Sequence, residues 1–214
     1  MKKAAPLVVI VMVIMAALSF TNLFGITAAG ATVPIGVLFF FINKAVNKQS
    51  YEQSGLDFKS IGRCFKARPS VWVWVLLPLV MNAVCVAISL IALPEFLAHV
   101  VSRTGETVSF SNILLMVLQL VIFALGEEIA WRAFFQNELQ KALPVIPALL
   151  ITSLLFSTAH IASGETVVVI YDIFFVFINS ILYGVVFYKT KNACISAISH
   201  FAANLFSIII LLII

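Results

Sequence analysis

Two adjacent glutamates, Glu127 and Glu128, lie in an otherwise apolar stretch, and Arg132 follows them at helical spacing. Carboxylates in hydrocarbon are costly, and such residues usually mark functional sites. Glu128 and Arg132 are four residues apart on one helical face, so we expect them to pair and to offset part of their burial cost. Glu127 points about 100° away on a helix. It is therefore the carboxylate left for general acid or base chemistry.

Two later apolar stretches each contain a histidine. His160 follows Phe156 by one helical turn, and His200 and Asn204 share a face because they are four residues apart. Polar groups on one face of a membrane helix need partners inside the bundle. A carboxylate and an imidazole can activate water, and imidazole and carboxamide N–H groups can stabilise an oxyanion. This set of side chains indicates a buried reaction centre in which no serine or cysteine need act as nucleophile.

The elements that position these residues read as membrane spans. Of the 214 residues, 63% are hydrophobic and 10% are charged, against about 25% charged in soluble domains. Continuous rather than alternating apolar runs favour helices over a barrel. We therefore predict an all-α polytopic transmembrane bundle of about seven spans. The predicted spans are 6–24, 26–43, 71–93, 110–132, 145–162, 167–188 and 193–213.

The polar groups of three spans fall at similar depths. At about 1.5 Å per residue, Glu127 lies about 20 Å from one end of its helix, His160 about 24 Å, and His200 with Asn204 about 14–20 Å. The chain therefore divides into N-terminal spans with an interfacial segment, 1–109, and a catalytic core, 110–207. We expect the core residues to surround one cavity that opens toward the cytoplasm.

Basic residues gather in alternate extramembrane segments, and the other side carries only Arg103. By the positive-inside rule, the N-terminus is cytoplasmic. The first apolar run is long for a signal peptide and a second span follows almost at once, so we expect the first span to be retained rather than cleaved. The net charge of +4 is read as this topology signal, facing lipid headgroups and not nucleic acid. The basic residues on the predicted cytoplasmic side are Lys2, Lys3, Lys44, Lys48, Lys59, Arg63, Lys66, Arg68, Lys141, Lys189 and Lys191.

Two extramembrane segments and the cysteines complete the pattern. In 43–70, apolar residues on one helical face beside basic residues predict a short helix on the cytoplasmic leaflet. The segment 94–109, with Glu106 among its polar residues, reads as a connecting loop. The three cysteines are far apart in the sequence and fit packing roles rather than disulfides or a metal site.

Together these motifs resemble those of the CPBP family, which comprises type II CAAX prenyl proteases and bacteriocin-processing and immunity proteins. The motifs are Glu127-Glu128-x-x-x-Arg132, Phe156-x-x-x-His160 and His200-x-x-x-Asn204, in the family's order and inside spans. The resemblance implies a multi-pass intramembrane endopeptidase of the cell membrane, here expected to be a bacterial plasma membrane, that cleaves a membrane-associated peptide or protein. It implies that Glu127 and His160 activate water and that His200 and Asn204 stabilise the oxyanion. Glu128, Arg132 and Phe156 support them.

Three alternatives stay open from the sequence. Glu127, His160 and His200 offer three zinc ligands, although we favour a reaction that requires no cofactor. A non-catalytic immunity or regulatory protein would bind a membrane-active peptide with the same cavity. A transporter with a carboxylate proton relay is less consistent, because the chain shows no inverted repeat.

Overall fold

The computed structural model describes residues 6–105 and 108–213; Lys2, Lys3 and Glu106 lie outside these ranges. The described residues form helices and no strands, which confirms the predicted all-α fold. The longest helices are α1 (Pro6–Ser19), α2 (Thr32–Val46), α5 (Ser70–Ala92), α7 (Ile113–Glu128), α10 (Thr166–Thr190) and α11 (Ala193–Ile213).

Six helical stretches in the described part of the chain are long and apolar enough to cross a membrane. The predicted fifth span, 145–162, is shorter than expected. Its helix, α9 (Val145–Thr158), has 14 residues. That length is about 21 Å of helix, against a hydrocarbon core of about 30 Å. The helix starts after Pro144 and ends before a turn that carries His160.

A π-helix, η4 (Ile129–Gln136), continues α7 without a break and leads into α8 (Asn137–Leu139). All eight η4 residues are buried. π-Helical turns are rare and occur frequently at functional sites. Here the π-helix carries Arg132 directly after the glutamate pair at the end of α7.

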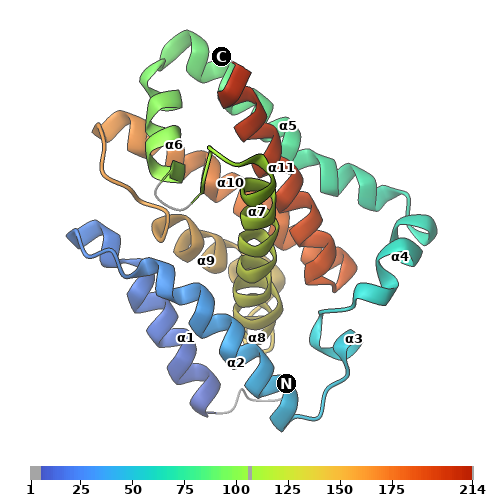
Figure 1. The fold of residues 1–214 in the computed structure, drawn as a ribbon. Helices are drawn as coiled ribbons and strands as arrows, with labels where there is room; N and C mark the ends of the chain where they lie inside the picture. The colour runs from blue at the N-terminus through green and yellow to red at the C-terminus, as the bar shows by residue number, and fades with distance from the viewer. Residues whose placement is uncertain (1–5, 106–107, 214) are drawn as a thin grey trace.

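The glutamate-bearing segment runs through the middle of the molecule (Figure 1). α2 packs on η4, α1 packs on α2, and α11 packs on α7. α10 lies against α5, α9 and α11. An apolar cluster around η4 includes Trp131, Phe134, Phe156 and Phe187. This packing holds the glutamates between α11, which carries His200, and the end of α9, where the following turn carries His160.

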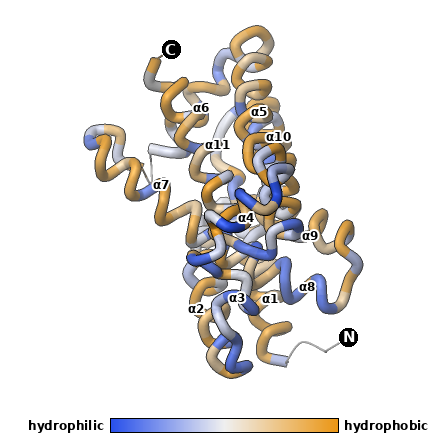
Figure 2. The backbone as a smooth tube through the Cα atoms, turned by 90° about the vertical axis from the view of Figure 1, so that its right-hand side faces the viewer, coloured by the Kyte–Doolittle hydropathy of each residue, from blue (hydrophilic) through white to orange (hydrophobic). Residues whose placement is uncertain are grey.

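The polar segment after α2 forms three short helices, which Figure 2 shows as one of the more hydrophilic parts of the tube. Ile61 and Phe65 pack against apolar clusters, and Lys59 and Arg63 are exposed, so the segment is helical and amphipathic as predicted. Phe58 is 58% exposed, and the position of these helices on the cytoplasmic leaflet stays a prediction. The helices are α3 (Tyr51–Ser54), η3 (Phe58–Ser60) and α4 (Ile61–Ala67).

The segment 94–109 is not a plain loop, because it contains α6 (Glu95–Gly105). α6 packs on α5 and α10, with Phe96 buried against Tyr171 at 5.0 Å between ring centroids. α6 has one apolar and one polar side rather than a continuous apolar sequence, so its composition is not that of a membrane span. The helix covers one end of the bundle.

Candidate active site

Glu128 and Arg132 form a fully buried ion pair, with 3.3 Å between Arg132 Nε and Glu128 Oε2. Arg132 Nη2 donates to Ser180 Oγ on α10, at 2.9 Å. Ser196 Oγ on α11 donates to Glu128 Oε2. The expected pairing on one helical face is therefore present, and it links α7 and η4 to two neighbouring helices. Glu128 has both oxygens engaged by protein groups.

His200 lies between the two glutamates. Its Nδ1 is 3.0 Å from Glu128 Oε1, and its Nε2 is 3.7 Å from Glu127 Oε2. A carboxylate accepts hydrogen bonds, so Nδ1 carries a proton and donates to Glu128. The ring also stacks on Tyr183 of α10, with centroids 4.3 Å apart. These contacts fix the orientation of the imidazole and direct Nε2 toward Glu127.

His160 is held by the turn at the end of α9. Its Nδ1 donates to the Phe156 carbonyl oxygen at 2.7 Å, because a carbonyl can only accept. Nε2 of the neutral ring is then the unprotonated nitrogen. The Phe156 ring lies 4.4 Å from the imidazole between centroids. The Asn22 carboxamide donates to the Ala159 and Ile161 carbonyls, which ties this turn to the α1–α2 connection.

Glu127 differs from its neighbour in exposure. Its side chain is 20% exposed, whereas the Glu128 side chain is fully buried. Among the described residues, no direct hydrogen bond or ion pair joins Glu127 to His160. The two side chains face the same cavity instead. A water molecule that bridges them would be in reach of both groups.

A cavity of about 660 Å³ brings the predicted residues together. Glu127, His160, His200 and Asn204 all line it, as does Phe156, while Glu128 and Arg132 lie behind its wall. The four polar side chains come from α7, the turn after α9, and α11. The cavity volume is in the range of small-molecule and peptide sites.

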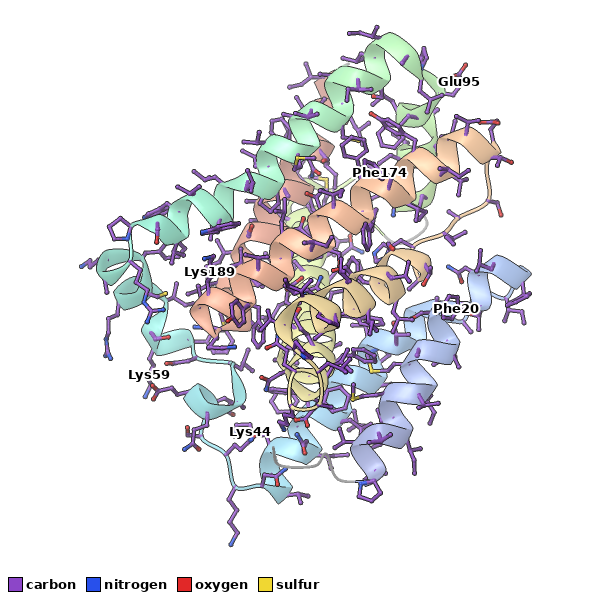
Figure 3. The ribbon with its side chains drawn as sticks, turned by 180° about the vertical axis from the view of Figure 1, so that it is seen from behind. Phe20, Lys44, Lys59, Glu95, Phe174 and Lys189 are labelled. Atoms are coloured by element: carbon purple, nitrogen blue, oxygen red, sulfur yellow. The ribbon has the colours of Figure 1, made fainter. Side chains whose placement is uncertain are left out.

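The cavity opens on the side away from the basic segments. Its exposed lining residues lie in the α1–α2 connection, on α6, on α7 and after α9, and they are Gly25, Thr27, Gly30, Ser102, Phe123 and Ser163. Figure 3 shows Lys44 and Lys59 toward one end of the bundle and Glu95 of α6 at the other. The basic segments and the cavity opening lie at opposite ends of the bundle. The two predictions, a cytoplasmic N-terminus and a cavity that opens toward the cytoplasm, therefore cannot both be correct.

Several cavity residues were missed by the sequence argument. Asp172 is 3% exposed and contacts His99 Nε2 at 3.3 Å and Arg103 Nε at 3.2 Å, so it fastens α6 to α10. Asn82 and Asn179 also line the cavity, from α5 and α10. Their signal was in the sequence, since each of Asp172, Asn82 and Asn179 is a polar residue inside a predicted span.

The zinc alternative requires Glu127, His160 and His200 to meet at one point. The residues that the structure describes include no group of three or more His, Cys, Asp or Glu side chains arranged to hold a metal ion. A protein oxygen engages Nδ1 of each histidine and leaves Nε2 without a hydrogen bond to any other described residue, which is also the usual arrangement of metal-ligating histidines. The metal requirement therefore stays a prediction, and we assign no catalytic step to a metal.

Comparison with protein families gives a match, over residues 109–206, to the family described as type II CAAX prenyl endopeptidase Rce1-like. The matched segment contains all three motifs and is similar to that family, which confirms the resemblance. Comparison with curated proteins and with solved structures gives no significant match. The family and the apolar helices together indicate a protease-type enzyme that is a multi-pass membrane protein.

Proposed function

We propose that the protein is an intramembrane endopeptidase that hydrolyses a peptide bond of a membrane-associated peptide or protein. The proposal rests on one observation above all: two acid–base groups and two potential oxyanion donors, from three helical segments, line one cavity. The helical stretches that carry Glu127, His200 and Asn204 are long and apolar enough to cross a membrane, and amide hydrolysis there requires a polar pocket that shelters water from lipid.

In the proposed reaction, Glu127 accepts a proton from a water molecule that also contacts His160 Nε2. The resulting hydroxide attacks the carbonyl carbon of the substrate, and the C–O bond forms as the carbonyl oxygen becomes an oxyanion. Glu127 then delivers its proton to the leaving nitrogen, and the C–N bond breaks. Glu127 suits this role better than Glu128, because Glu128 Oε1 and Oε2 both have protein partners.

His200 and Asn204 are the proposed oxyanion donors. The proton on His200 Nδ1 is directed to Glu128, so donation toward the substrate requires a second proton on Nε2. Nε2 lies 3.7 Å from Glu127 Oε2 and belongs to the cavity side of the ring, whereas Nδ1 lies 3.0 Å from Glu128 Oε1. The Asn204 carboxamide adds an uncharged donor from the next turn of α11. Removal of one such donor typically costs about 10²–10³ in rate.

The substrate class that fits best is an apolar peptide, with a prenylated C-terminal peptide as the first candidate from the family description. An apolar groove adjoins the cavity at Ile161, which lines both. The groove is lined by aliphatic and aromatic side chains such as Ile170 and Phe174. An isoprenoid chain would lie there without crossing the polar cavity.

The test compares cleavage of internally quenched apolar peptides, with and without a farnesyl thioether, by purified protein in detergent. Glu127→Gln and His160→Ala should lower kcat by about 10²–10⁴, the usual contribution of general acid–base catalysis. Glu52→Gln, on exposed α3, serves as the matched control. Activity should persist in chelator. Cleavage by Glu127→Gln at the wild-type rate would contradict the assignment of Glu127 as the base. A wild-type protein that binds the peptides but does not cleave them would favour a non-catalytic immunity or regulatory protein.

A further inference from the structure

Three asparagines from three helices line the cavity at one level. Asn204 lies one turn beyond His200 on α11. Asn179 lies one turn before Tyr183 on α10, and the Tyr183 ring stacks on His200. Asn82 of α5 contacts both of the other helices. The carboxamides therefore form a layer about 5.4 Å from His200, the rise of one helical turn.

The hydrogen bonds of Asn82 fix the orientation of its amide. Its Nδ2 donates to the Ala203 carbonyl at 2.9 Å and to Ser207 Oγ at 2.9 Å. Because the carbonyl can only accept, the nitrogen must be on that side, and Oδ1 is left as an acceptor. Asn179 Nδ2 is the group that donates to Asn82 Oδ1. The orientation of the Asn179 amide follows from that of Asn82.

One hydrogen-bond acceptor of the Asn82–Asn179 pair has no donor within the described part of the chain. Asn179 is 8% exposed, and its Oδ1 has no hydrogen-bond partner among the residues that the structure describes. A buried polar atom without a partner is unfavourable, because it has lost its hydrogen bonds to water. The Oδ1 atom is covered, but Asn179 belongs to the cavity wall, so a small turn of its side chain would bring Oδ1 to the cavity. Any O–H or N–H group can serve as the donor, and a peptide substrate supplies main-chain N–H groups.

We propose that the Asn82–Asn179 pair is a subsite for the substrate main chain, in which Asn179 Oδ1 accepts a peptide N–H. The inference rests on the proposed function and names a contact within it. An extended strand rises about 3.3 Å per residue, so one helical turn corresponds to between one and two residues from the scissile carbonyl. Asn82 acts as a positioning residue, because it holds the Asn179 amide with its oxygen free. Recognition of main-chain atoms is independent of side chains and suits an enzyme that accepts several sequences.

The test is an ester scan of the peptide substrate. In a series of internally quenched apolar decapeptides in detergent micelles, one amide N–H at a time is replaced by an ester oxygen on either side of the cleavage site. Wild type and Asn179→Leu are compared on each peptide. Asn47→Leu is the matched control, since Asn47 is an exposed asparagine at the end of α2.

In the wild type and in Asn47→Leu, one ester one or two residues from the cleaved bond should lower kcat/KM about tenfold, mainly through KM; tenfold corresponds to about 1.4 kcal/mol. In Asn179→Leu the same ester should have no further effect. A merely structural role for Asn179 would lower activity on all peptides equally, and that outcome overturns the inference. If Asn179→Leu does not fold, Asn179→Ala gives the same comparison. If wild type cleaves none of the peptides, the proposed function fails, and the subsite fails with it.

Discussion

At the scale of single residues, the two glutamates have opposite surroundings although they are adjacent in the chain. Glu128 contacts Arg132, Ser196 and His200 and is fully buried, whereas Glu127 faces the cavity. The pairing with Arg132 could be predicted from four-residue spacing alone. The contacts with α11 could not, because they depend on how two helices are rotated about their axes.

Because Glu128 and Arg132 form a buried ion pair, we expect the effects of their substitutions on stability to be strongly coupled. Arg132→Gln should lower the free energy of unfolding by about 3–5 kcal/mol, because it leaves a buried carboxylate without its counter-charge. Glu128→Gln should have a similar effect, because it leaves the buried Arg132 guanidinium without its counter-charge. The free energy of unfolding of the double variant should fall by clearly less than the sum of the two single effects. Unfolding in mixed micelles with increasing denaturing detergent measures all three.

The pair Glu138 and Lys141 provides the comparison, because the Lys141 side chain is 34% exposed, whereas that of Glu138 is 4% exposed. Asn43 also donates a hydrogen bond to Glu138. Lys141→Gln should therefore lower the free energy of unfolding by less than Arg132→Gln does, because the Glu138 carboxylate keeps a donor and water reaches position 141. Strict additivity of the Glu128 and Arg132 variants would contradict the coupling and would assign the stability to other contacts of the two side chains.

At the scale of elements, apolar runs predicted the long helices, whereas shorter or irregular helices differed from expectation. α9 ends at Thr158 because the chain turns toward His160 and the polar segment that contains Gly164. α6 was missed because it lies over the end of the bundle and has a mixed composition. The π-helical geometry of η4 extends over only eight residues, too few for its period to be separated from that of an α-helix by sequence.

The close contact of α2 with η4 predicts that Gly36 tolerates no side chain. A Cβ at Gly36 would lie 2.6 Å from Ala130 Cβ and 2.9 Å from Ala130 Cα, so the η4 backbone would have to move. Gly36→Ala should destabilise the fold by about 1–3 kcal/mol, as overpacking does. It should also lower peptidase activity, because η4 directly follows the glutamate pair. Unfolding midpoints and cleavage rates of the purified variant measure both effects.

Gly62→Ala is the matched control, because a Cβ at Gly62 of α4 would have no neighbour within 4 Å. This variant should be neutral or more stable by up to about 1 kcal/mol, since alanine favours a helix more than glycine does. Equal midpoints for Gly36→Ala and wild type would show that α2 and η4 are free to separate.

At the scale of the whole molecule, the charge and the cavity opening lie at opposite ends of the bundle. The sequence predicted that three motifs meet, since their depths agree, and that the cavity opens on the cytoplasmic side together with the basic segments. The second prediction is not met, because the opening and the basic segments lie at opposite ends. The side on which the cavity opens is set by the α1–α2 connection, by α6 and by the turn after α9. If the basic segments face the cytoplasm, the substrate enters from the outer side of the membrane or from the outer leaflet.

Labelling of single cysteines tests this orientation in cells that express the protein. In a Cys64→Ser background, Ser102→Cys on α6 should react with a membrane-impermeant maleimide on intact cells. Lys59→Cys in η3 should react only after the membrane is permeabilised, because positive residues are retained on the cytoplasmic side. Both positions are exposed, and the remaining Cys85 and Cys194 are buried, so the background signal should be low. The reverse labelling pattern would show that the cavity opens to the cytoplasm and that this chain does not follow the positive-inside rule.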